Sequence, residues 1–197
     1  GTERGTARGT ARGTERGTAR GTARGTERGT ERGTARGTEA SKLWAKTGLS
    51  YRAELILRFR QGIINRSTEI VEICVSEAGK TRPDAEAELD RAVQALTHAS
   101  GVQHFLTTNF SQNVAGGIDI ADLRFPIGVI AGVGPFNFPI LIPILHSAMA
   151  IVTGNTYIAK PSEKVPSISR LFADIWNAAG LPDGCFNVLN GQKEIVE

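Results

Sequence analysis

The chain of 197 residues has a formal net charge of +3 at pH 7, and this charge is unevenly distributed. Residues 1–40 contribute +4, whereas the other 157 residues carry −1, so the basic balance does not indicate a basic binding surface beyond residue 40. No run of 18 apolar residues is present, which argues against a membrane-spanning helix.

Residues 1–40 are ten four-residue units, Gly-Thr-Ala-Arg or Gly-Thr-Glu-Arg, and Ala40 replaces the last arginine. Glycine at every fourth position leaves no apolar face at the period of a helix or a strand, so we predict that this low-complexity repeat is disordered. Its arginines could neutralise phosphate. The interleaved glutamates and the lack of aromatic residues argue against a nucleic-acid partner.

Residues 41–110 are predicted to form three amphipathic helices. The second helix ends at Gly79, the third at Gly101, and Thr81 with Asp84 has the spacing of a capping box at the start of the third. The three apolar stripes are Leu55, Phe59 and Ile63, then Ile70, Ile73 and Cys74, then Ala85, Leu89, Val93 and Leu96.

A strand segment is predicted over residues 111–126. Ile118 and Ile120 alternate with Asp119 and Ala121, which is the pattern of a strand with one buried face. The flexible pair Gly116-Gly117 precedes this strand.

Residues 127–197 show continuous apolar strands separated by helical patterns, in the order βαβαβ. Strands without polar alternation indicate burial on both faces, so this series predicts a parallel, Rossmann-like sheet, the first half of a dinucleotide-binding fold. The fold class is therefore α/β. Ligands of such sheets bind beyond the carboxyl ends of the strands.

The turns after the first two strands of this series carry candidate ligand-binding residues. Gly132 and Gly134 match the first two positions of the dinucleotide fingerprint, but Asn137 occupies the third. After the second strand, Lys160 and Glu163 could bind ribose hydroxyls. The alternative is that Ser162 caps the next helix, with Glu163 in its first turn.

Several motifs together resemble the aldehyde dehydrogenase superfamily over about residues 41–197. These are PFNFP, GNT followed by IAKPSE, and AGLPDG followed by FNVLNG. The stretches FNFPILIP, MAIVTGNT, KPSEKVPS and GQKEIV are most similar to the methylmalonate-semialdehyde dehydrogenase branch, which is acylating and uses coenzyme A.

The resemblance implies a catalytic role for Asn137. In the family, the corresponding side-chain amide donates to the aldehyde oxygen as that oxygen gains negative charge, and a donor of this kind is worth more in a site shielded from water. The alternative is an asparagine that caps the following helix.

The resemblance also implies that NAD is the cofactor, because Glu163 would repel the 2′-phosphate of NADP. It implies a carboxylate-binding role for Arg91, which lies in a Glu-x-x-Arg run, although a solvated arginine on a polar helix face is the ordinary alternative. The cofactor-binding residues that it implies are Gly134, Phe136, Lys160, Glu163 and Lys164.

Neither cysteine is predicted to be a nucleophile. Cys74 shares a helix face with Ile70 and Ile73, and Cys185 opens a strand, so both are expected to be buried as small apolar residues. The family's nucleophilic cysteine belongs to a later segment, so we expect residues 1–197 to be an N-terminal fragment that is inactive alone. No spacing of histidines indicates a metal site.

The resulting hypothesis is a fragment of an NAD-dependent semialdehyde dehydrogenase that forms an acyl-CoA. Two alternatives are a fragment of another NAD(P)-dependent aldehyde dehydrogenase, and a non-catalytic protein whose repeat binds nucleic acid. The resemblance further implies a homo-oligomer without membrane attachment, in the cytoplasm, or in the mitochondrion of a eukaryote.

Overall fold

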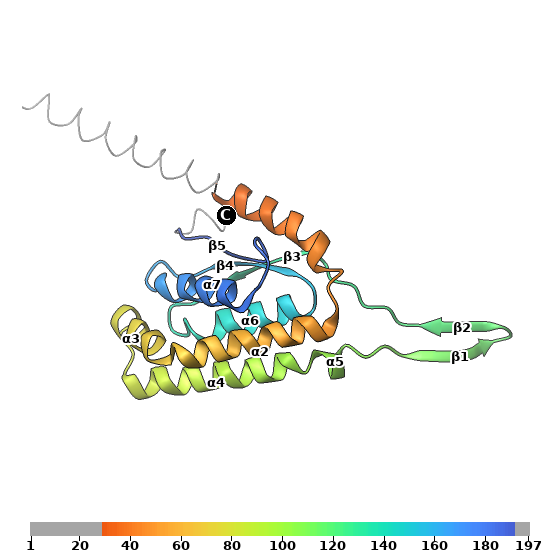
Figure 1. The fold of residues 1–197 in the computed structure, drawn as a ribbon, viewed down its shortest axis with the longest axis horizontal. Coiled ribbons are helices and arrows are strands. Elements are labelled where there is room, and N and C mark those ends of the chain that lie inside the picture. The colour runs from red at the N-terminus through yellow and green to blue at the C-terminus, as the bar shows by residue number, and fades with distance from the viewer. Residues whose placement is uncertain (1–28, 192–197) are drawn as a thin grey trace, which may run out of the picture.

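The computed structural model describes residues 29–191, which are layered on a small parallel sheet (Figure 1). The strands lie in the order β3-β4-β5, and all three are parallel. Two crossover helices, α6 and α7, join them, which confirms the predicted βαβαβ unit. These elements are β3 (Val129–Val133), α6 (Leu141–Val152), β4 (Thr156–Lys160), α7 (Ser167–Ala179) and β5 (Phe186–Val188).

The three predicted N-terminal helices pack on the crossover helices, on the side away from the sheet (Figure 1). At the start of the third, the Thr81 side chain accepts a hydrogen bond from the Asp84 backbone amide, as the capping-box spacing predicts. The helices are α2 (Leu49–Asn65), α3 (Ser67–Ala78) and α4 (Arg82–Ser100), followed by the short α5 (Val102–Phe105).

The core lies between these helices and the sheet. The ring of Phe59 on α2 stacks on Trp176 of α7 with centroids 3.7 Å apart. Gly62 allows this close approach, because a Cβ there would lie 2.5 Å from Ile175 Cγ2. Strand β4 is almost fully buried, whereas edge strand β3 is partly exposed, so burial on both faces holds only for the inner strand.

The strand segment over residues 111–126 is a hairpin that projects from the body (Figure 1). Strand β2 (Ile118–Ala121) pairs antiparallel with β1 (Phe110–Ala115), which sequence reasoning missed, and Gly116-Gly117 forms the turn. The predicted burial of one face is wrong. Both strands are exposed along their length, because among the described residues no element packs on either face of the hairpin.

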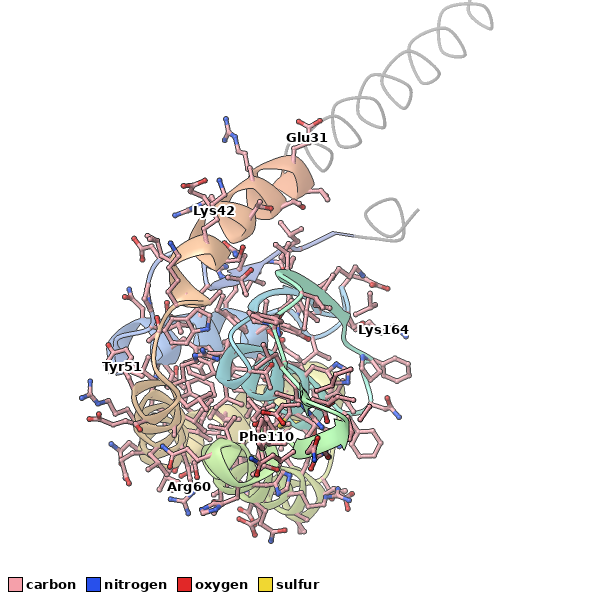
Figure 2. All side chains as sticks on the ribbon, turned by 90° about the vertical axis from the view of Figure 1, so that its right-hand side faces the viewer. Glu31, Lys42, Tyr51, Arg60, Phe110 and Lys164 are labelled. Atoms are coloured by element: carbon pink, nitrogen blue, oxygen red, sulfur yellow. The ribbon has the colours of Figure 1, made fainter. Side chains whose placement is uncertain are left out.

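Residues 29–40, predicted to be disordered, are helical and continue as one helix to residue 44; residues 1–28 of the repeat lie outside the described part of the chain. This helix of residues 29–44, the repeat helix, lies on the face of the sheet opposite α6 and α7 (Figure 1). Figure 2 shows the side chains of Glu31 and Lys42 pointing outward from the body.

The glycines of the repeat explain why this helix forms. Gly33 and Gly37 are buried, and Cβ atoms there would meet Leu189 at 3.2 Å and Thr156 at 3.3 Å. The Gly37 carbonyl also accepts a hydrogen bond of 3.0 Å from Thr156 Oγ1. The stripe of small residues therefore lets the helix backbone approach the sheet closely, and this contact replaces the apolar face that the sequence lacks.

The two ends of the glycine stripe give a matched test of this packing. A Cβ on Gly29 would meet no atom within 4 Å, so Gly29→Ala should stabilise the protein by up to about 1 kcal/mol through helix propensity. Gly37→Leu should destabilise it by about 1–3 kcal/mol through overpacking against the sheet. Urea unfolding of both variants checks this, and equal effects at the two positions would contradict the packing.

Candidate functional site

The loops after β3 and β4 meet at the carboxyl edge of the sheet. The backbone amide of Gly134 donates to the Lys160 carbonyl at 2.9 Å. Lys164 Nζ lies 4.5 Å from the centroid of the Phe136 ring, close enough for a cation–π contact. The structure thus brings together four of the five residues predicted to bind the cofactor, which are Gly134, Phe136, Lys160 and Lys164. Lys164 lies at the surface, well away from the repeat helix (Figure 2).

The fifth residue, Glu163, faces the ammonium group of Lys160. The distance from Lys160 Nζ to Glu163 Oε2 is 3.7 Å, and the two side chains are 11% and 52% exposed. A buried donor therefore lies beside an exposed acceptor. This pair has the hydrogen-bonding groups that the two hydroxyls of a ribose require.

The alternative role of this loop, a cap for the next helix, is not supported. Helix α7 begins at Ser167, beyond Ser162 and Glu163. The Ser162 hydroxyl instead accepts from the Lys164 amide at 3.3 Å, within the loop itself. The first amide of α7 donates to the carboxylate of Glu77, on α3, at 3.2 Å.

Glycine stands at the two positions of the partial fingerprint, Gly132 and Gly134, for different physical reasons. A Cβ on Gly132 would lie 1.7 Å from the Tyr157 hydroxyl, so Tyr157 alone requires glycine there. A Cβ on Gly134 would meet protein atoms only at 3.6 Å and beyond, and its φ is not in the left-handed region. Neither contacts nor backbone conformation of the protein thus demand glycine at 134, which leaves room for a ligand there.

Asn137 lies exposed in the loop between β3 and α6. Within the described part of the chain its side chain makes no hydrogen bond, and α6 has no side-chain cap from its own N-cap residue, Ile140. The helix-cap alternative for Asn137 is therefore wrong. Its amide is free to bind a ligand.

The cap of α6 comes from Glu88 on α4, a residue that sequence reasoning missed. Glu88 is fully buried, and its Oε1 accepts from the amides of Ile140 and Leu141, each at 2.8 Å. Its other oxygen pairs with Lys80, whose side chain is 17% exposed. A signal was present, since Glu88 stands in the apolar stripe between Ala85 and Leu89.

Arg91 also lies near the asparagine loop, which is the segment of residues 134–140 that joins β3 to α6 and carries Asn137. The ring of Phe138, the neighbour of Asn137, lies 4.6 Å from Lys80 Nζ and 5.8 Å from the guanidinium carbon of Arg91. Arg91 is exposed and forms no salt bridge within residues 29–191. Its guanidinium group is thus close to the loop and available to an anion.

A buried cation holds the opposite end of α6. Arg52 is 6% exposed and donates to the Val152 carbonyl at 3.1 Å, and to the Thr47 carbonyl at 2.7 and 2.9 Å. Burial lowers the pKa of Arg52 from its ordinary value. Carbonyl oxygens at the end of a helix carry partial negative charge, which compensates this cation.

Both cysteines are fully buried, as predicted. Burial raises the pKa of the Cys74 thiol to about 11, and the Glu88 carboxylate adds to this effect. Burial likewise raises the pKa of the Cys185 thiol to about 11. Because the thiolate is the reactive form, neither group suits nucleophilic attack near neutral pH.

Between residues 29 and 191, no three His, Cys, Asp or Glu side chains are grouped so that they could hold a metal ion. In the same part of the chain, every helix is too short or too polar to span a bilayer.

Comparison with known proteins places these features in a family. The model of the aldehyde dehydrogenase family matches residues 13–197, so the match begins inside the repeat, before residue 41, from which the sequence resemblance was expected. The bovine protein named methylmalonate-semialdehyde/malonate-semialdehyde dehydrogenase [acylating], mitochondrial, is 39% identical over 153 residues, which are 78% of this chain and 28% of that protein.

Solved structures show the same relationship. The methylmalonate-semialdehyde dehydrogenase of Oceanimonas doudoroffii superposes with a TM-score of 0.83 and 38% identity, covering 85% of this chain and 34% of that one. A protein of Sinorhizobium meliloti 1021, described as a methylmalonate-semialdehyde dehydrogenase and solved with NAD, gives a TM-score of 0.81 and 36% identity over 83% and 33%. The chain thus spans about a third of the length of these structures.

The raised thiol pKa values predict the pH dependence of stability. Both cysteines stay protonated in the folded protein up to about pH 11, whereas in the unfolded chain they ionise near the ordinary value of 9.0. The unfolded state therefore binds fewer protons between these values, so the unfolding free energy should fall as pH rises through this window.

Cys74→Ala/Cys185→Ala gives the control, since its unfolding free energy should lose this part of the slope. Urea unfolding between about pH 8 and 11 measures it. In the same samples, Ellman's reagent at about pH 7.5 should label neither thiol until urea is added. Rapid labelling of the folded protein would contradict the burial of both groups.

Proposed function

Because the chain belongs to the aldehyde dehydrogenase family, we propose that residues 29–191 form the N-terminal third of an NAD-dependent malonate- or methylmalonate-semialdehyde dehydrogenase. The reaction would oxidise a semialdehyde to an acyl-CoA. The observation that carries the proposal is the free side-chain amide of Asn137, on a loop that adjoins both the Lys160–Glu163 pair and Arg91.

The residues present fit NAD. Gly134 leaves space beside the Lys160 carbonyl, and Lys160 with Glu163 offers a donor and an acceptor for ribose hydroxyls. The carboxylate of Glu163 would disfavour the additional phosphate of NADP. When bound, NAD supplies the hydride acceptor of the oxidation. This chain would hold the adenosine ribose and place the Gly134 and Phe136 backbone beside the other half of the cofactor.

Asn137 would act as a hydrogen-bond donor to the reacting oxygen. When a thiolate adds to the aldehyde carbon, the carbonyl oxygen gains negative charge, and an N–H donor directed at that oxygen stabilises the transition state more than the substrate. Phe136 and Phe138 flank Asn137 in the sequence, but the asparagine is exposed within residues 29–191, so other segments of the enzyme would exclude water from its amide. A weakly hydrated donor is stronger than the same donor in bulk solvent.

Arg91 would bind the carboxylate that distinguishes malonate-type semialdehydes from simple aldehydes. Its guanidinium group lies beside Phe138, one residue from Asn137, and is exposed. An arginine fork matches a carboxylate in two parallel hydrogen bonds. The acylating name of the bovine relative supports coenzyme A as the acceptor of the acyl group in this proposal.

The nucleophilic thiolate would come from a segment outside residues 29–191. Cys74 and Cys185 are buried thiols with raised pKa values, so neither suits this role. Among residues 29–191 strand β3 pairs with β4 alone, and an apolar groove of about 480 Å³ lies between β3 and α6. Further strands of the same sheet beside β3 would cover this groove.

We also propose that the projecting hairpin mediates homo-oligomer formation. Phe110, Val114, Ile118 and Ile120 are each at least 50% exposed, and a second copy of the protein would bury them. For the compartment, the name of the bovine relative supports a mitochondrial location only if this protein is eukaryotic.

The test of the proposed reaction uses an enzyme rebuilt by joining this chain to the C-terminal part of the Oceanimonas doudoroffii relative. There, Asn137→Ala should lower the single-turnover acylation rate by about 10² to 10³-fold, because it removes a donor that acts mainly in the transition state. The dissociation constant for NAD should change little. Rapid-quench kinetics with an NAD titration measure both.

Lys160→Ala is the matched control and should show the opposite effects on the acylation rate and on the dissociation constant for NAD. It should weaken NAD binding through lost ribose hydrogen bonds and leave acylation at saturating NAD nearly unchanged. An Asn137→Ala enzyme that acylates at the parent rate would disprove the donor role.

If the hairpin forms the oligomer interface, charged substitutions in it should change the oligomeric state. In the rebuilt enzyme, Ile118→Asp/Ile120→Asp should shift the oligomer toward monomers, because charged residues cannot be buried unpaired in the interface. Leu43→Asp, at a 74% exposed leucine near the end of the repeat helix, is the control and should leave the assembly unchanged. Light scattering after size exclusion decides, and an intact oligomer in the double variant would count against the interface.

A further inference from the structure

We infer that Glu88 is a positioning residue for the reaction proposed above, and that it acts through Asn137. The inference rests on that proposed function. Glu88 touches neither the amide of Asn137 nor any atom that would react. It instead holds the backbone three and four residues after the asparagine, from a different helix.

The carboxylate of Glu88 anchors the backbone that follows Asn137. One carboxylate oxygen of Glu88 accepts from two successive amides, those of Ile140 and Leu141, at 2.8 Å each. Asn137 stands three residues before Ile140, with Phe138 and Pro139 between them. Proline fixes its own φ, and the Phe138 ring is held by Lys80 and Arg91, so little freedom remains between the anchored amides and Asn137.

The carboxylate of Glu88 is both buried and paired with a cation. Glu88 is fully buried, and its one ionic partner within residues 29–191 is Lys80. A buried carboxylate needs such compensation, and the positive end of the α6 dipole adds to it. The buried charge pair ties α6 to Lys80 in the connection between α3 and α4, and Arg91 lies three residues after Glu88 on α4.

The other crossover helix, α7, is also capped by a glutamate from an N-terminal helix. Glu77 makes a weaker contact of the same kind for α7, since its carboxylate accepts from one amide, that of Ser167, at 3.2 Å. Both glutamates come from an N-terminal helix and cap a crossover helix of the sheet. Only the Glu88 cap adjoins the asparagine loop. Glu77 therefore offers a matched control for the purely structural effect of losing a carboxylate cap.

The first experiment uses the full 197-residue chain and measures amide hydrogen exchange by NMR. Glu88→Ala should accelerate exchange at Ile140 and Leu141 by about tenfold or more through the loss of their acceptor. Glu88→Gln keeps a neutral acceptor and should restore most of the protection. Glu77→Ala should accelerate exchange at Ser167 and leave Ile140 and Leu141 unchanged.

The second experiment is a double-mutant cycle in the rebuilt enzyme. Glu88→Ala should lower the single-turnover acylation rate by about 10²-fold, the loss expected when a reacting group is misplaced by about 1 Å. In the Asn137→Ala background the same change should alter the rate by no more than about twofold, because the group that Glu88 positions is already absent. Glu88→Gln should recover most of the rate, and at saturating NAD Glu77→Ala should not lower it.

The outcomes separate the two proposals. If Asn137→Ala does not slow acylation, the proposed function fails. If Asn137→Ala slows acylation but the Glu88→Ala effect adds to it in full, Glu88 has a general structural role and the positioning inference is overturned. Unchanged exchange at Ile140 and Leu141 in Glu88→Ala would overturn it as well, whatever the kinetics show.

Discussion

Helix α6 is held at both ends by buried charged side chains from the N-terminal helices, and the candidate site depends on this arrangement. Glu88 accepts from the first amides of α6, and Arg52 donates to the Val152 carbonyl at its other end. Each charge matches the sign that the helix dipole favours at that end. A hydrogen bond to a charged group contributes about 1.5–3 kcal/mol, so these contacts fix α6 firmly against α2 and α4.

A fixed α6 also fixes the loop that begins it. The loop leaves β3 at Gly134, whose amide is bonded to Lys160, and it ends at the amides that Glu88 holds. Both ends of this short segment are therefore anchored to different parts of the body. Between them Asn137 has no partner within the described residues, which is the arrangement expected of a side chain that serves a ligand.

Much of the fold could be predicted from the sequence because its signals are local. Stripes such as Leu55, Phe59 and Ile63 specify helices at the 3.6-residue period, and the uninterrupted apolar residues of β4 specify a buried strand. The loops after the strands follow from the topology of parallel sheets. Lys160 and Glu163 could thus be selected as candidate site residues before their distances were known, whereas the role of Asn137 was inferred from the resemblance to the aldehyde dehydrogenases.

The errors arose where a residue's environment is set by a distant segment. Residues 29–40 lack an apolar face, yet Gly33 and Gly37 make a helix possible because the sheet accepts a close backbone. The burial of Glu88 depends on α6, 52 residues further along the chain. Ile118 and Ile120 alternate like residues of a half-buried strand, but among residues 29–191 nothing covers the hairpin.

The central claim is that Glu88, and not Asn137, caps α6, so that the asparagine amide is left for the substrate. A crystal structure of the rebuilt enzyme with bound NAD tests this most directly. We expect the Glu88 carboxylate to lie within hydrogen-bonding distance of the Ile140 and Leu141 amides, and Asn137 Nδ2 to face the space between the cofactor and the nucleophilic sulfur. A structure in which Asn137 Oδ1 accepts from an amide of α6 would contradict it.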